Sequence, residues 1–165
     1  MTLRPTTMEE RRLLNPAFSG VLIARAVAGY QSESQKGLPF LYSYLILPLV
    51  LHSETRNRLP STVVTRLINW TERNTELTTH FSRRMADLAL ATKEGLLLIT
   101  TTGLAHIVDE ARIVLVATDK TFANFEKATP SDEVSSCCKK AHFVGRWLAS
   151  SGTAPTVLTA LGVRL

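Results

Sequence analysis

Apolar residues recur at helical spacing along much of the chain and predict a mainly helical protein. Asn15 is a good N-cap and Pro16 suits a first helical position, so a helix is expected from Pro16 to about Tyr30. Residues 6–14 have helical character before it, because acids precede bases there. Residues 31–37 are polar and predict a loop.

The apolar run that follows, Leu38 to Leu51, is fourteen residues long and contains Pro39 and Pro48. A membrane span needs about 20 consecutive apolar residues, so this run is too short to cross a bilayer. We expect a helix from about Pro39 to His52, bent at Pro48 and buried in the core or against another subunit.

Leu59 and Pro60 end that segment, and a helix is predicted to start after Pro60 and run through Asn74. Its apolar face is made of residues at helical spacing, with Trp70 just after them: Val63, Val64, Leu67 and Ile68. Asn74 can cap the next helix, which carries a regular apolar stripe of Leu77, Phe81, Met85 and Leu88. Arg83 and Arg84 lie on the opposite, polar face, so we regard them as candidates for nucleic-acid contact.

The predicted secondary structure changes from helix to strand at Gly103. Residues 92–102 are predicted to be helical, although their continuous apolar run also suits a strand. Two β-rich runs, 104–108 and 112–116, are joined by residues 109–111 and predict a hairpin. The expected fold class is mainly α with a small β-hairpin, and short helices followed by a hairpin match the order of a winged-helix-like core.

Residues 119–129 are expected to form a loop or an irregular helix. Pro130 and Ser131, followed by two acids, mark a clear helix start, and a last short helix is expected over about 154–161. We expect a single domain over residues 1–165, made of a helical N-terminal part (1–37), a helical core plus hairpin (38–118) and C-terminal helices (130–165).

The charge is unevenly distributed. Residues 1–84 hold eleven Lys or Arg against six acids, a net charge of +5, whereas residues 85–165 hold eight of each. Thirteen of the nineteen cations are Arg, which suits forked contacts with carboxylates or phosphates. An acidic partner or nucleic acid fits this excess, and so does a solvated face in an Arg-rich protein.

No pattern predicts a catalytic residue, a bound cofactor or a metal. The eight glycines are scattered and none belongs to a phosphate-binding loop. Cys138 and His142 are four residues apart, but no second pair completes a zinc site. The adjacent Cys137 and Cys138 and the polar start of the chain, which does not resemble a secretion signal, suit a cytoplasmic protein.

Two clusters of aromatic and basic residues have the composition of binding hot spots, although Trp is also a common core residue. One surrounds Trp70 and the other contains Trp147, and an Arg-bearing loop precedes the first. The candidate partner-binding residues are Arg56, Arg58, Arg66, Trp70, Arg73, Arg146 and Trp147.

Short phrases spread along nearly the whole chain resemble one known family. They are Asn15–Phe18, Gly37–Pro39, Leu47–His52, Arg58–Pro60, Trp70, Lys140–Ala149 and Leu161–Arg164. In this order they resemble the middle component of three-component ABC systems, whose best-known group is the Lamassu-type anti-phage defence systems with their LmuC-like subunit.

This resemblance implies a small subunit without catalytic activity that acts with two larger partners. One is an SMC-like ABC ATPase and the other is an effector, often a nuclease. We expect the chain to dock on the ATPase and to couple its DNA-sensing state to the effector in an anti-phage or anti-plasmid defence complex. DNA contact is then made mainly through the complex, with no membrane involved.

Two other classes of function stay open. A winged-helix DNA-binding regulator would explain the helix and hairpin order and the positive charge, but residues 92–102 and the acidic hairpin turn suit the major groove poorly. A hydrolase assembled in space around His52, His80 or His106 is the least favoured, because no nucleophile motif accompanies these residues.

Overall fold

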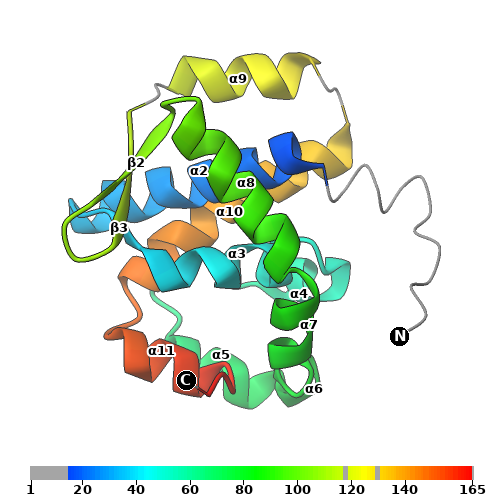
Figure 1. Cartoon of the computed structure of the whole chain (residues 1–165). Coiled ribbons are helices and arrows are strands. Elements are labelled where there is room, and N and C mark those ends of the chain that lie inside the picture. The colour runs from blue at the N-terminus through cyan, green and yellow to red at the C-terminus, as the bar shows by residue number, and fades with distance from the viewer. Residues whose placement is uncertain (1–14, 117–118, 129–130, 165) are drawn as a thin grey trace, which may run out of the picture.

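The computed structural model describes residues 15–116, 119–128 and 131–164, so the helix predicted over residues 6–14 lies outside the described part. Helices dominate it, together with a small antiparallel sheet, which confirms the predicted class. Buried hydrophobic side chains from both halves of the chain form one core cluster. Figure 1 shows helix α2 running through the middle of the helical body, crossed by α8.

Helix α2 (Pro16–Ser34) begins as predicted, because Asn15 Oδ1 accepts a hydrogen bond from the backbone N–H of Ala17 at 2.8 Å. It extends through the predicted loop at 31–34 and ends only where Gln35 adopts a left-handed conformation. Leu22, Ile23 and Val27 are fully buried, as are small residues on its other faces. A helix buried on several sides must lie at the centre of the fold.

Glycines set the distance between α2 and its two main neighbours, α8 (Ala89–Thr101) and α10 (Asp132–Ala149). A Cβ on Gly145 of α10 would lie 1.9 Å from the carbonyl oxygen of Ala26. A Cβ on Gly29 would lie 2.0 Å from the carbonyl oxygen of His142. Gly20 and Gly95 allow the same close approach between α2 and α8, so the three backbones pack directly on one another.

The run predicted as one helix over residues 39–52 contains three elements. Leu38–Pro39 is strand β1, Phe40–Tyr42 is the short 3-10 helix η1, and Ser43–Val50 is helix α3, which keeps Pro48 inside it. The prediction of a helix from Pro39 was therefore wrong at its start, because Leu38 and Pro39 pair with a strand more than seventy residues away. Nearly all of α3 is buried, as expected of this apolar run.

The hairpin is confirmed. Strands β2 (Ala105–Val108) and β3 (Arg112–Leu115) pair antiparallel, with Ile107 opposite Ile113, and β1 adds a third strand in the order β1-β3-β2. The turn between β2 and β3 has left-handed backbone conformations at Glu110 and Ala111. The sheet packs against α2, where Gln31 Oε1 accepts the backbone N–H of Leu115 at 2.9 Å.

The helices between α3 and α8 are short, and the first of them occupies residues predicted to form an Arg-bearing loop. They are α4 (Ser53–Arg58), α5 (Leu67–Arg73), α6 (Thr75–Thr78) and α7 (Phe81–Asp87). The helix expected from residue 61 begins only at Leu67, and the predicted Leu77–Leu88 stripe is divided among α6, α7 and the residue that follows α7. Only Leu88 separates α7 from α8, less than the 3–4-residue turn of a helix-turn-helix. The winged-helix-like core is thus not confirmed.

The C-terminal region follows the prediction closely. Residues 119–128 are the exception: they form the regular helix α9 (Asp119–Ala128), where a loop or irregular helix was expected. Ser131 caps α10 by accepting the N–H of Val134. Helix α11 (Ala154–Ala160) ends before Gly162, which has a φ of +72°. In Figure 1, α11 and α5 lie side by side at the end of the molecule opposite α9.

The close packing of α2 and α10 predicts that Gly145→Ala destabilises the fold strongly. The new methyl group would overlap the Ala26 carbonyl oxygen, which is backbone and cannot rotate away. We expect a loss of about 3 kcal/mol in the free energy of unfolding, measured by urea denaturation. Lys139→Ala, an exposed change on the same helix, should stay within about 0.5 kcal/mol of the wild type. Equal stability of the two variants would contradict the packing.

Candidate functional site

The two tryptophans predicted to bind a partner lie in the core. Trp147 is fully buried and Trp70 is 4% exposed, and their rings meet edge to face with centroids 5.4 Å apart. Their indole N–H groups donate to the carbonyls of Thr65 and Arg58, each at 2.7 Å. Both rings therefore belong to the core and stabilise the surface that lies above them. Direct contact of either ring with a partner stays a prediction, and this burial argues against it.

Three of the predicted arginines form ion pairs inside the chain. The guanidinium of Arg56 is almost fully buried, donates to the Val50 carbonyl at 2.8 Å and pairs with Glu133 at 3.3 Å, which ties α4 to α10. Arg146 pairs with Glu33 at 3.1 Å and ties α10 to α2. These contacts give Arg56 and Arg146 a structural role, whatever else they bind.

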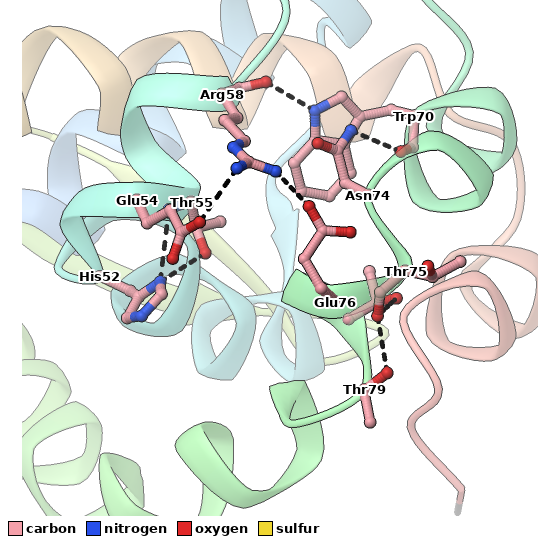
Figure 2. A network of polar contacts seen from close by, with 10 residues as sticks. His52, Glu54, Thr55, Arg58, Trp70, Asn74, Thr75, Glu76 and Thr79 are labelled. Atoms are coloured by element: carbon pink, nitrogen blue, oxygen red, sulfur yellow. Dashed lines mark hydrogen bonds and ion pairs between the residues drawn. The ribbon is translucent and has the colours of Figure 1, made fainter.

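Arg58 lies at the centre of the polar network in Figure 2. Its guanidinium pairs with Glu54 of α4 at 3.1 Å and with Glu76 of α6, while its carbonyl accepts the Trp70 indole N–H. The pKa of Glu76 is lowered, first by its own backbone N–H and also by Arg58. Asn74 completes the network by donating to the Trp70 carbonyl at 2.8 Å. The network fixes α4, α5 and α6 relative to one another.

The two arginines proposed for nucleic-acid contact differ in their surroundings. Arg84 is partly buried, donates to the Leu77 carbonyl at 2.9 Å and lies over the Phe81 ring, with 5.7 Å between the guanidinium carbon and the ring centroid. Burial lowers its pKa. Arg83 is exposed and has no hydrogen-bond or ion-pair partner among the described residues. Of this pair, Arg83 is the one open to an external anion.

Arg66 and Arg73 are also exposed without a partner in the described part of the chain, and they flank the exposed side of α5. Leu67, Trp70 and Thr71 of α5 are buried, so the helix turns its other side outward. Ile68 on that side is 46% exposed, and Val64 just before it is 84% exposed. The combination of unpaired arginines and exposed aliphatic side chains has the character of a protein-binding surface.

A groove of about 390 Å³ runs beside these residues. Arg66, Leu67 and Ile68 form one wall, and the other wall comes from the α10–α11 junction, chiefly Ser151, Gly152, Thr156 and Ala160. We call this groove, together with Val64 and Arg73, the α5 surface. It has no titratable pair or nucleophile arrangement suited to catalysis, and its chemistry fits an apolar side chain flanked by carboxylates.

Sequence reasoning identified Arg66 and Arg73 but missed the rest of the α5 surface. Val64 and Ile68 were placed on the apolar face of a long helix, whereas that helix begins only at Leu67 and leaves both side chains exposed. Trp70, which the predicted stripe left outside its regular spacing, was the one local signal that a different face is buried. The opposite groove wall lies more than eighty residues away in sequence and had no local signal.

Among the described residues, no group of three or more His, Cys, Asp or Glu side chains could hold a metal ion. Cys137 and Cys138 are buried and not joined in a disulfide, and burial raises the pKa of the Cys137 thiol. His80 and His106 are exposed on separate elements. Within the described ranges, no helix is long and apolar enough to cross a membrane.

His52 has a structural function as the N-cap of α4. Its Nδ1 atom accepts the backbone N–H of Thr55 at 3.3 Å and lies 2.7 Å from the Thr55 hydroxyl oxygen. Burial lowers the pKa of His52, the nearby charge of Arg84 lowers it further, and Glu54 opposes them. The cap requires the neutral imidazole, because a protonated Nδ1 cannot accept a hydrogen bond.

The lowered pKa of His52 predicts acid-dependent stability. Its pKa lies below the unfolded value of 6.5, so its contribution is complete above that pH and is lost as the pH falls through the folded pKa. His52→Asn keeps a capping side chain but does not titrate, so it should lose less stability than the wild type between about pH 7.5 and about pH 5.5. Urea unfolding across this range would measure the difference. Parallel pH profiles would show that His52 does not contribute.

Comparison with known proteins adds one positive finding to this geometry. No curated protein and no solved structure matches the chain. The family model described as "ABC-three component (ABC-3C) system Middle Component 3" matches residues 4–165. This match spans nearly the whole sequence, including α2, the sheet and the α5 surface. The chain therefore belongs to the Middle Component 3 family of ABC three-component systems.

Proposed function

We propose that this middle component is an accessory subunit without catalytic activity, which docks on an SMC-like ABC ATPase through the α5 surface. Docking couples the DNA-bound state of the ATPase to an effector subunit, often a nuclease. Family membership supports the existence of partner subunits, since a middle component belongs to a system of several components. The resemblance to Lamassu-type subunits supports a role in anti-phage or anti-plasmid defence in the cytoplasm.

The observation that carries this proposal is the contrast between Arg66 and Arg73 of the α5 surface and three other arginines predicted to bind a partner. Arg56, Arg58 and Arg146 are neutralised by acids of the same chain, whereas Arg66 and Arg73 have no partner among the described residues. Exposed Val64 and Ile68 lie on the same surface, next to the groove. An acidic partner face with one apolar side chain for the groove would satisfy both features.

The ATPase is the proposed occupant because the family resemblance implies such a partner, and the surface is rigid enough to suit docking. Trp70 and Trp147 pack edge to face beneath it, and the network around Arg58 fixes the helices on either side. A preorganised surface loses little conformational entropy on binding and can transmit a change in its partner to the rest of the subunit. Nothing in the α5 surface offers a reaction of its own.

Variants of the α5 surface should weaken assembly without unfolding the chain. Ile68→Asp, or Arg66→Glu combined with Arg73→Glu, should lower retention of the co-expressed ATPase at least about tenfold, or about 1.4 kcal/mol. The physical reason is that each change places an acid opposite an acidic or apolar partner face. Size-exclusion chromatography of the co-expressed subunits would measure it, with thermal unfolding as the check on folding.

Lys93→Glu is the matched control, because Lys93 is an exposed cation on α8, away from the α5 surface. It lowers the net charge by two units, half the change of the double arginine variant, and should leave co-elution unchanged. If the wild-type chain never co-elutes with the ATPase, the docking proposal is refuted. If all variants co-elute normally, the ATPase binds a different surface.

A DNA-binding regulator is the second candidate, favoured by the net charge of +5 and by exposed Arg83, Arg66 and Arg73. Arg66 and Arg73 lie at the two ends of α5 and Arg83 lies on α7, so the three arginines are not gathered on one recognition helix. The hairpin that would act as a wing has Asp109 and Glu110 at its tip, which repel phosphate. The structure thus favours at most weak contact with the DNA backbone.

A salt titration separates the two candidates. For the isolated chain we expect no saturable duplex binding at about 0.15 M salt, because few phosphates would be neutralised. If binding does occur, Arg83→Glu should reduce the slope of log affinity against log salt by about 1, measured by fluorescence anisotropy. Tight, sequence-dependent binding by the isolated chain would support the regulator instead.

A further inference from the structure

The two edges of the three-stranded sheet differ in how they are closed. Strand β1 is only two residues long and contains Pro39, which has no backbone N–H to offer at the edge. The chain then turns into η1, whose Phe40 N–H donates to the Ala111 carbonyl at 2.8 Å. Beyond the end of β1, the N–H of Leu115 donates to the Gln31 side chain. The β1 side of the sheet therefore offers little to a further strand.

The β2 edge has none of these features. The backbone N–H of Val116 donates to the Leu104 carbonyl, so the hydrogen-bonded pairs continue as His106 with Val114 and Val108 with Arg112. Ile107, between these pairs, therefore directs its N–H and C=O away from β3. No hydrogen bond to either group is found within the described residues. The strand also has no Pro, Lys, Arg or bulge, the usual means of blocking an edge.

Apolar side chains at this edge are also exposed to solvent. Leu38, Ile113 and Ile107 form one row across the core-facing side of the sheet, because each pairs with the next. The first two are fully buried and Ile107 is 52% exposed. On the outer side Val108 and Val116 are exposed, where an antiparallel sheet usually carries polar residues. A strand added beside β2 would complete the row and cover Val108.

The charge near the edge indicates what kind of strand would fit. Asp109 is exposed and has no partner in the described part of the chain, and Glu110 forms only a long 3.6 Å contact with Arg112. The hairpin tip is thus acidic in a chain whose net charge is +5. A segment that carries Lys or Arg next to its apolar positions would be attracted to it. A second copy fits less well, because its own β2 would bring another acidic tip and no cation.

We propose that the free edge of β2 pairs with an extended segment of a partner subunit of the three-component assembly, with alternating apolar residues and a Lys or Arg that faces Asp109. This inference rests on the proposed function, since it assumes an assembly with partner subunits. The exposed edge is short, so the added strand is a secondary contact in a complex held mainly elsewhere. In Figure 1 the hairpin and α5 lie in different parts of the molecule, so both surfaces are accessible at once.

The decisive variant is Ile107→Pro, with Ile107→Val as its matched control. Proline at 107 removes the outward N–H but no hydrogen bond between β2 and β3, whereas valine keeps both the N–H and the branched side chain. In co-expression of the three subunits with a tag on this chain, Ile107→Pro should lower retention of one partner at least about tenfold. Asp109→Lys should lower it as well, and Ile107→Val should not.

Hydrogen exchange gives a second measurement that needs no variant and decides the matter if Ile107→Pro does not fold. The Ile107 amide should exchange at least about tenfold more slowly in the wild-type complex than in the isolated chain. Unchanged exchange, or equal retention of both partners by a folded Ile107→Pro, would overturn the inference. So would a homodimer of the isolated chain that Ile107→Pro converts to a monomer, because a second copy would then occupy the edge.

The α5-surface variants, assayed in parallel, separate the two ideas. Loss of the complex with Ile68→Asp but not with Ile107→Pro would contradict the β2-edge inference and leave the proposed function intact. Absence of any complex with the wild-type chain would refute both. Loss of one partner with the α5 variants and of the other with Ile107→Pro would support both and show that the subunit holds two partners through two surfaces.

Discussion

The close backbone contact between α2 and its neighbours α8 and α10 is the constraint on which the rest of the structure depends. Four glycines, Gly20, Gly29, Gly95 and Gly145, remove the side chains that would otherwise separate these helices. The ion pair between Arg146 and Glu33 and the hydrogen bond from Leu115 to Gln31 extend this packing to the protein surface and to the sheet. Both proposed docking surfaces are therefore attached to one rigid centre.

The use of arginine follows from this architecture. Buried or half-buried guanidinium groups require acids or carbonyls, and Arg56, Arg58 and Arg84 obtain them from neighbouring helices. Part of the positive charge of the first half is thus paired with acids or carbonyls inside the fold. Among the described cations of that half, Lys36, Arg66, Arg73 and Arg83 are exposed and their charged groups have no partner, while the hairpin tip is acidic. The two proposed surfaces thereby present opposite charges to different partners.

Sequence reasoning was most accurate where the determining interactions are local. The Asn15 cap, the Ser131 cap and the hairpin depend on residues within a few positions of one another, and all three are present. It failed where contacts between residues far apart in the sequence determine the secondary structure. Pro39 was assigned to a helix because its strand partner, Arg112, is far away in sequence, and Val64 was assigned to a helix that begins only at Leu67.

The sequence by itself determined the fold class, several helix starts, the hairpin and membership of a family whose name implies partner subunits. The fold class, helix starts and hairpin follow from periodicity and capping, which depend on residues close together in the sequence. Family membership follows from short sequence phrases. Only the tertiary structure decided which arginines are neutralised, that Trp70 and Trp147 are buried against each other, and which sheet edge is left open. Such outcomes depend on desolvation and pairing between segments far apart in the chain, and no local pattern encodes them.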